Sequence, residues 1–205
     1  MLRVDHLKVR GLPPLSFSVS KGECLAVEGP SGCGKTLLLR AIADLDRVEG
    51  AIFLEGAERN EMPASSWRQQ VRLVTSEASW WADTAREHMS ESLVYDRLLS
   101  TFGLDEALLD RRLDSLSTGE RQRLALVRAL ADDPKVLLLD EPTALLDTAN
   151  AARVDADLTE RLIAGRIILL VSHDQTQIER LAHIRLQLGN PMRPNRANPE
   201  AVATR

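Results

Sequence analysis

A glycine-rich segment near the N-terminus has the residue types and spacing of a phosphate-binding loop. It reads Gly29-Pro30-Ser31-Gly32-Cys33-Gly34-Lys35-Thr36 and fits G-x-x-x-x-G-K-[ST] at every fixed position. In such a loop, backbone N–H groups point at phosphate oxygens, the lysine faces the β- and γ-phosphates, and the threonine hydroxyl can hold Mg²⁺. We therefore expect nucleotide binding here, with Lys35 on the phosphates and Thr36 on the metal.

Two adjacent acids form a second candidate site. Asp140 and Glu141 directly follow the apolar run 136–139. An apolar strand that ends in acids places carboxylates at the carboxyl edge of a parallel sheet, where ligands bind. We expect Asp140 to hold Mg²⁺ through water and Glu141 to polarise the water that attacks the γ-phosphate. Such a pair can also be a plain helix N-cap, but the neighbouring phosphate loop favours the chemical interpretation.

The elements that must position these residues alternate along the chain. Continuous apolar runs suit strands covered on both faces, as in a parallel sheet between helix layers. Between residue 78 and about residue 130 no convincing strand occurs, so we expect a helical insertion. We predict one domain over 1–189 and a poorly ordered tail over 190–205, which is rich in Pro, Asn and Arg. The predicted strands are 2–9, 15–19, 23–28, 51–54, 71–75, 136–140 and 166–171.

Composition narrows the class of protein. A net charge of −4 with only 3% aromatic residues argues against a nucleic-acid partner. No apolar run approaches the roughly 20 residues of a membrane-spanning helix, and the N-terminus does not begin a signal peptide. The two cysteines, Cys24 and Cys33, have no metal-ligand spacing, and we expect them to be reduced in the cytosol.

A third segment, Leu116-Ser117-Thr118-Gly119-Glu120, connects these sites to a family. A small hydroxyl residue and a glycine at a helix start can cap the helix or bind an anion. Together, the three motifs resemble the ATP-binding cassette ATPases, the nucleotide-binding subunits of ABC transporters. The usual family signature is Leu-Ser-Gly-Gly-Gln, from which this chain departs at its third and fifth positions. Asp147 in Ala144-Leu145-Leu146-Asp147 and His173 in Val171-Ser172-His173-Asp174 match two further family motifs, and the resemblance covers residues 2 to about 188.

The resemblance implies a fold and a mechanism. The fold is a P-loop NTPase core of α/β class, with a mainly parallel sheet between helices, an N-terminal antiparallel β subdomain and a short inserted helical subdomain. Two such chains meet head to tail, and each ATP is clasped between the phosphate loop of one and the signature of the other. The implied catalytic residues are Lys35, Glu141 and His173. The implied nucleotide contacts are Gly29, Pro30, Ser31, Gly32, Cys33, Gly34, Lys35, Thr36, Leu37, Ser117, Gly119 and Asp147.

The same resemblance implies an ATP-hydrolysing subunit that dimerises on ATP and drives a permease in a separate chain, on the cytoplasmic face of the membrane. Segments 67–71 and 80–84 are similar to a small bacterial subgroup whose permease is proposed to export iron or another metal. Two adjacent tryptophans, Trp80 and Trp81, cannot both face inward from one helix stripe. We expect at least one to be partly exposed where the permease docks, the alternative being that both pack between helices.

Two positions depart from the family pattern. Ser76 stands where the family has a glutamine that touches Mg²⁺ and the attacking water, so we expect Ser76 to reach the metal only through water, unless Glu77 or another nearby group fills the role. The family stacks an aromatic residue on adenine, and here the candidates are Val9 and Arg10. Arg10 could stack through its guanidinium plane.

Two other functions stay open. One is a soluble cassette ATPase of DNA repair or translation, although those proteins carry long coiled coils or two cassettes, and this chain has neither. The other is a regulatory cassette that binds ATP and hydrolyses it weakly. The chain keeps Lys35, Asp140, Glu141 and His173, and this favours hydrolysis.

Overall fold

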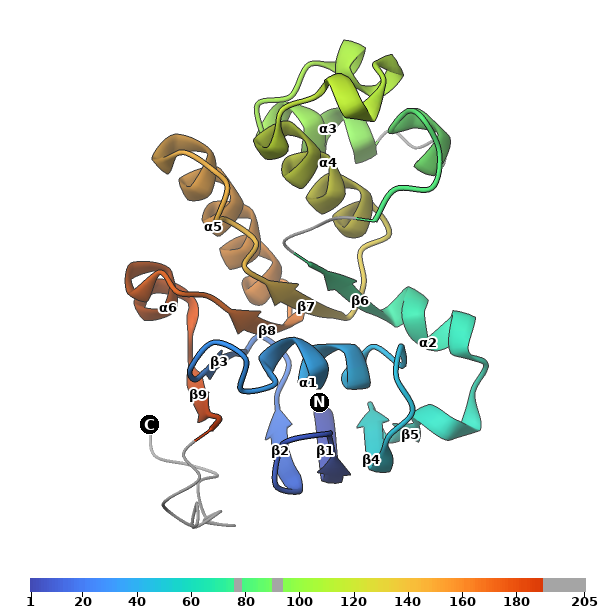
Figure 1. Ribbon diagram of the computed structural model, residues 1–205, viewed down its shortest axis with the longest axis vertical. Helices are drawn as coiled ribbons and strands as arrows, with labels where there is room; N and C mark the ends of the chain where they lie inside the picture. The colour runs from blue at the N-terminus through green and yellow to red at the C-terminus, as the bar shows by residue number, and fades with distance from the viewer. Residues whose placement is uncertain (76–78, 90–93, 190–205) are drawn as a thin grey trace.

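The computed structural model describes residues 1–75, 79–89 and 94–189. It confirms the predicted α/β class, with two sheets and helices around them (Figure 1). The antiparallel sheet has the order β2-β1-β4-β5 and the parallel sheet the order β6-β7-β8-β3-β9. The strands are β1 (Leu2–Lys8), β2 (Leu15–Val19), β3 (Cys24–Glu28), β4 (Glu49–Leu54), β5 (Ala57–Glu58), β6 (Val71–Val74), β7 (Val136–Asp140), β8 (Ile167–Val171) and β9 (Ile184–Gln187).

The helices divide between the faces of the parallel sheet. Helix α1 lies between the two sheets, whereas α4 and α5 lie beyond the opposite face of the parallel sheet (Figure 1). The helices are α1 (Lys35–Ile42), α2 (Ala64–Gln70), α3 (Val94–Thr101), α4 (Thr118–Ala131), α5 (Thr148–Ile163) and α6 (Gln175–Leu181). None of the helices in the described ranges is long and apolar enough to cross a membrane.

Two apolar cores account for this layering. In β7, Leu137 and Leu139 pack with α3, α4 and α5, whereas Val136 and Leu138 pack with α1 and the antiparallel sheet. Side chains alternate between the faces of a strand, so a strand that is apolar at every residue needs cover on both sides. The continuous apolar runs at 136–139 and 167–171 are buried throughout, as the sequence predicts.

Helices and short 3₁₀ turns fill most of the predicted insertion. Besides α3 and α4, the described part holds 3₁₀ turns at Arg86–His88, Glu106–Asp110 and Leu113–Ser115, and one isolated bridge between Thr84 and Arg112. In Figure 1 these segments form a lobe above the parallel sheet. The predicted tail at 190–205 and Ser76 lie outside the described residues.

Strands β5 and β9 were not predicted. The first has two residues, and the second is a short alternating strand at the edge of the parallel sheet. Val9 also needs correction as a candidate adenine contact. It is 5% exposed and packs in the core with β1 and β2, so it presents no free surface to a base.

Candidate active site

The phosphate loop connects β3 to α1 through backbone conformations that glycine favours. Gly29 has a φ of +151°, and an ideal Cβ there would lie 2.5 Å from the carbonyl oxygen of Leu188. Gly34, with a φ of +105°, precedes the first residue of α1. Side chains with a Cβ are strained at such positive φ values. The glycines therefore allow the loop to turn sharply and to pack against the end of β9.

Lys35 begins α1, and its side chain folds over the loop. Its Nζ donates hydrogen bonds to the carbonyl oxygens of Gly29 at 2.8 Å and Pro30 at 3.0 Å. Lys35 is 9% exposed, whereas Ser31 and Gly32 are exposed at the outer turn of the loop. The ammonium group is thus held inside a loop whose outer backbone faces solvent, beside the N-terminus of α1, which favours anions.

Thr36 and Asp140 bring the two motifs into direct contact. The Thr36 Oγ1 donates a hydrogen bond to Asp140 Oδ2 at 2.6 Å across the carboxyl edge of the parallel sheet. Asp140 is 7% exposed at the end of β7. A hydroxyl and a carboxylate are the hard oxygen ligands that Mg²⁺ prefers. This donor pair therefore fits the metal that the phosphate loop requires.

Glu141 has an unusual backbone. Its φ is +55°, a left-handed conformation that costs a non-glycine residue about 1–2 kcal/mol. Its N–H donates to the carbonyl oxygen of Val171 at 2.9 Å, which holds the residue against the end of β8. Its Oε1 is buried without a hydrogen-bond partner among the described residues. Strain and an unpaired buried acceptor at one residue indicate function.

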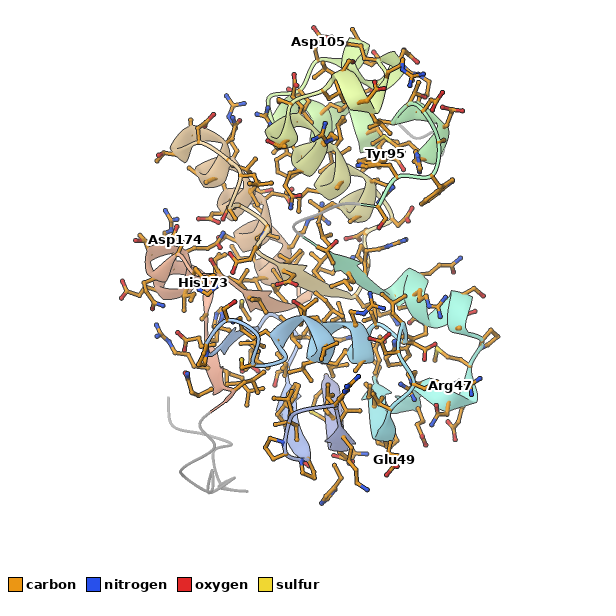
Figure 2. All side chains as sticks on the ribbon, in the orientation of Figure 1. Arg47, Glu49, Tyr95, Asp105, His173 and Asp174 are labelled. Atoms are coloured by element: carbon orange, nitrogen blue, oxygen red, sulfur yellow. The ribbon has the colours of Figure 1, made fainter. Side chains whose placement is uncertain are left out.

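His173 faces this carboxylate from the segment between β8 and α6. Its Nε2 lies 3.4 Å from Glu141 Oε1, without hydrogen-bond geometry, and its side chain is 67% exposed. Figure 2 shows His173 beside Asp174 at the point where the chain enters α6. Asp174 caps that helix by accepting a hydrogen bond from the Thr176 N–H at 2.9 Å. The exposed imidazole can therefore reach a ligand bound in front of Glu141.

Ser117 begins α4 in a reciprocal capping arrangement with Glu120. The Ser117 Oγ accepts from the Glu120 N–H at 3.2 Å and donates to Glu120 Oε2 at 2.7 Å, and the Ser117 N–H also donates to that oxygen at 2.8 Å. These bonds, led by that of the hydroxyl, lower the pKa of Glu120. Gly119 lies close to the chain after β7, because an ideal Cβ there would be 3.3 Å from the Leu145 carbonyl oxygen.

Asp147 caps α5 in a similar way. Its side chain accepts from the Asn150 N–H at 2.8 Å, and this bond is the main reason that its pKa is lowered. The structure thus brings Lys35, Thr36, Asp140, Glu141 and His173 to one edge of the parallel sheet. No hydrogen bond in the described part of the chain joins Ser117 or Asp147 to that group.

Sequence reasoning missed two contacts at this site, those of Leu12 and Gln122. Leu12 packs on the phosphate loop, where an ideal Cβ at Gly34 would lie 3.2 Å from Leu12 Cγ. Arg10, the remaining adenine candidate, is exposed in the same loop. Gln122, which is 2% exposed on α4, donates to the carbonyl oxygen of Thr75 at 3.4 Å and so holds the end of β6. The place of Gln122 two residues after the third segment was the only signal in the sequence.

A cluster that we call the tryptophan patch consists of Trp80, Trp81, His88 and Arg128. Trp81 is 76% exposed and Trp80 is partly buried, so the prediction of at least one exposed tryptophan is confirmed. The Arg128 guanidinium lies 4.3 Å from the Trp80 ring and 5.4 Å from the Trp81 ring. The His88 ring contacts both indoles edge-on, and burial lowers the pKa of Arg128. The patch is a continuous aromatic and basic cluster from which Trp81 is exposed.

Comparisons with known proteins cover most of the chain. The family model described as ABC transporter matches residues 12–144. The chain is similar to a probable anion import ATP-binding protein of Haloferax volcanii, with 35% identity over 83% of this chain and 69% of that protein. It is also similar to the probable iron export ATP-binding protein FetA of Escherichia coli, with 32% identity over 80% and 78%. A dimeric ATP-binding cassette solved in a post-hydrolysis state with ADP and Pi has a TM-score of 0.79, at 21% identity over 92% of this chain and 94% of that one.

Proposed function

This chain belongs to the ABC transporter family, and from that membership and the geometry of its site we infer that it is the ATP-hydrolysing subunit of a transporter. The observation that carries this function is the placement of Glu141. Its strained backbone aims a buried, unpaired carboxylate oxygen toward His173, beside the contact between Thr36 and Asp140. A cap or a structural ion pair needs no such arrangement. A site that activates water beside bound phosphates does.

The phosphate loop supplies binding. Backbone N–H groups of residues 31–36 would contact the phosphate oxygens, and Lys35 would turn its ammonium from the loop carbonyls toward the β- and γ-phosphates. Thr36 and Asp140 would hold Mg²⁺, with Ser76 reaching it through water. When bound, the metal neutralises charge on the phosphates.

Glu141 and His173 supply the chemistry. Water attacks the γ-phosphorus, the bond to the bridging oxygen breaks, and ADP leaves. The Glu141 carboxylate accepts a hydrogen bond from the attacking water and takes up its proton as the new P–O bond forms. Before the attack, His173 contacts the γ-phosphate with its exposed imidazole and orients the water. Such positioned groups contribute typically 10²- to 10⁴-fold to a rate.

The assembly we propose is a homodimer that closes on ATP. Ser117 and Gly119 at the start of α4 would contact the ATP held by the partner, and Asp147 would lie at the dimer seam. The head-to-tail arrangement rests on the family resemblance, and the dimeric state of the solved cassette of similar fold supports it. The head-to-tail arrangement also gives a role to Ser117 and Asp147, which make no hydrogen bond to the phosphate loop in the described part of a single chain.

We further propose that the permease is a separate chain and that this subunit works on the cytoplasmic face of the membrane. FetA, whose name describes a probable iron export ATP-binding protein, matches this chain over 78% of its own length, and this supports a chain that supplies ATP binding to an export system. The tryptophan patch is the proposed docking surface for the permease. An exposed indole stacked on a partly buried guanidinium is typical of protein interfaces, where Trp and Arg are enriched.

Hydrolysis and closure are tested with Glu141→Gln. This variant should bind ATP with unchanged affinity, hydrolyse it at least about a hundredfold more slowly, and shift from monomer to dimer in light scattering when ATP is added. Lys35→Ala should instead weaken ATP binding, because a charged contact to phosphate is lost. Glu160→Gln, on the exposed far end of α5, is the charge control and should behave as the parent. Parent-rate hydrolysis by Glu141→Gln would show that the catalytic acid is misassigned.

Docking is tested by co-purification from the native membrane. Trp81→Ala should lose the membrane protein that co-purifies with the parent chain while its ATP affinity stays unchanged. Ile163→Ala is the matched control, because Ile163 is 83% exposed on α5, away from the tryptophan patch. If Trp81→Ala still co-purified with the membrane protein, the tryptophan patch would not be the docking surface.

A further inference from the structure

His173 is held in place almost entirely by its backbone. Its side chain is 67% exposed, and among the described residues its ring has one polar contact, at 3.4 Å from Glu141. The chain enters α6 two residues later. Ser172, on the other side, is 7% exposed and follows β8 directly. The Asp174 N–H donates to Ser172 Oγ at 3.1 Å and so fixes the turn that carries His173. Since β8 is fixed within the sheet, the position of the imidazole depends on this turn and on how α6 is held.

Helix α6 is held by a polar cluster around the buried Asp155 as well as by apolar contacts. The Gln177 Nε2 donates to Asp155 Oδ1 on α5 at 2.6 Å, and Arg180 Nη2 lies 2.5 Å from Asp155 Oδ2. Gln177 is 1% exposed and Asp155 is 6% exposed. Ile178 and Leu181 supply the apolar side of the same helix.

The polar cluster around Asp155 contributes little net stability to the fold. Burial raises the pKa of Asp155, because the charged carboxylate loses hydration. The Gln177 Oε1 is buried without a hydrogen-bond partner among the described residues. Apolar residues of similar volume commonly stabilise a helix contact as well as a buried ion pair does. Hydrogen bonds are directional, however, so they fix the rotation of the seven-residue α6 more closely than apolar contacts do.

The cluster also joins two functional segments. Asp147 caps the helix that carries Asp155, and the eight-residue separation corresponds to about 12 Å along α5. The helix that carries Gln177 begins two residues after His173. We propose that Asp155, through Gln177 and Arg180, is a positioning residue that sets the place of the His173 imidazole opposite Glu141. The consequence for hydrolysis rests on the function proposed above for His173, whereas the placement itself does not.

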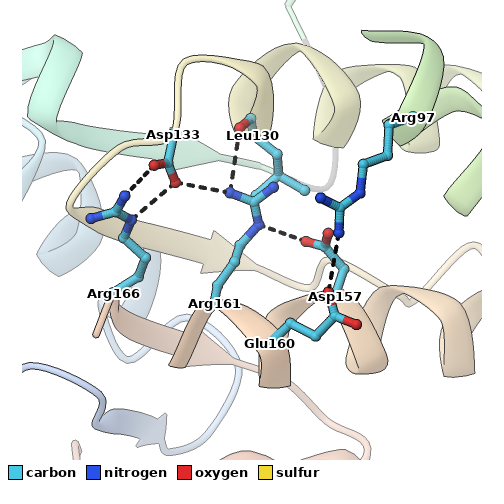
Figure 3. Close-up of polar contacts among 7 residues, drawn as sticks. All are labelled: Arg97, Leu130, Asp133, Asp157, Glu160, Arg161 and Arg166. Atoms are coloured by element: carbon cyan, nitrogen blue, oxygen red, sulfur yellow. Dashed lines mark hydrogen bonds and ion pairs between the residues drawn. The ribbon is translucent and has the colours of Figure 1, made fainter. Parts of the chain in front are cut away.

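The test compares two aspartates on α5. Asp157 is 9% exposed, and its Oδ2 accepts from Arg161 Nε at 2.6 Å on a side of the helix that faces α4 and Asp133 (Figure 3). It matches Asp155 in residue type, helix and burial, but its partners lie away from α6. Asp155→Ala and Asp157→Ala are compared by thermal unfolding, by the KM and kcat for ATP, and by the imidazole nitrogen NMR signals of His173 in nucleotide-free protein.

Both variants should lower Tm. Only Asp155→Ala should shift or broaden the His173 signals and lower kcat, by about ten- to a hundredfold, with KM within twofold of the parent. Unchanged His173 signals in folded Asp155→Ala would overturn the proposal, as would equal changes in Asp157→Ala. If His173 moves but kcat stays at the parent value in both Asp155→Ala and His173→Ala, the placement stands and the catalytic role of His173 fails.

A second variant serves if Asp155→Ala does not fold. Arg180→Met removes the ion pair from a half-exposed side chain and leaves the bond from Gln177 to Asp155 in place. It should shift the His173 signals in the same direction by a smaller amount. His173 signals identical to those of the parent in this folded variant would also overturn the proposal.

Discussion

Replacing Ser117 with alanine separates the structural role of this residue from its proposed role at the dimer seam. The change removes both hydrogen bonds between the Ser117 hydroxyl and Glu120, and with them the reciprocal cap of α4. Ser117 is exposed, so no buried cavity forms. The expected loss is therefore that of an N-cap alone, about 1 kcal/mol within a range of about 0.5–2 kcal/mol.

That loss should lower Tm at pH 7 by about 2–4 °C, the shift per kcal/mol typical of a domain of this size. Ser117→Asn is the control, because asparagine caps helices as well as serine does. The effect should also depend on pH. The pKa of Glu120 is lowered in the folded chain from its ordinary value of 4.5, so the carboxylate stabilises the fold above that value and loses its contribution as pH falls through the lower folded value.

The assay is thermal unfolding of the parent, Ser117→Ala and Ser117→Asn, without nucleotide, at pH 7 and at steps down to about pH 3. The gap between the parent and Ser117→Ala should narrow below the ordinary pKa of Glu120. Equal Tm values at pH 7 would refute the capping argument, as would a gap that does not change with pH. Ser117→Asn keeps the cap, so a loss of ATP-driven dimerisation in this variant would be due to the proposed role of Ser117 at the dimer seam.

Three further outcomes follow from other contacts. Two lysine side chains lower the pKa of Glu55 to about 2. In thermal unfolding, Glu55→Gln should therefore lose less stability than the parent between about pH 4.5 and pH 2 and change Tm little at pH 7. The same dependence of Tm on pH in both proteins would contradict this. Gly29→Ala should lose ATP binding in calorimetry, because its Cβ would meet the Leu188 carbonyl oxygen, and parent affinity would show that the loop can relax. Trp81→Ala should change the free energy of unfolding by less than about 0.5 kcal/mol in urea, and a larger loss would mean that the indole packs inside the fold.

The sequence predicts the layers of the fold well because they depend on pattern. Strands such as β7 and β8 are apolar at every residue, and only a sheet covered on both faces buries such runs. The sequence does not predict β9, because its four alternating residues at a sheet edge resemble those of many exposed segments. Its pairing with β3 depends on the whole sheet being in place.

The sequence likewise predicts some residues of the site and not others. The fixed spacing of the phosphate loop and the acids after β7 identifies Lys35, Thr36, Asp140 and Glu141 as neighbours, and the structure places Thr36 against Asp140 as the motifs imply. Asp155 gives no such signal, because an aspartate in a helix of mixed polarity looks like a solvated side chain. Its burial comes from the way α6 packs on α5, which local pattern does not encode. Leu12 lies in a loop, where no periodicity marks the residue that faces the phosphate loop.

The left-handed backbone of Glu141 means that stability and activity favour different residues at one position. Glycine adopts a φ of +55° without strain and asparagine adopts it more easily than glutamate does. A screen of random variants for heat resistance would therefore select Glu141→Gly or Glu141→Asn as improved proteins, while each had lost the carboxylate next to His173. The chain carries the strained glutamate at this position, so a ranking of variants by thermal stability alone would favour residues that remove the proposed activity.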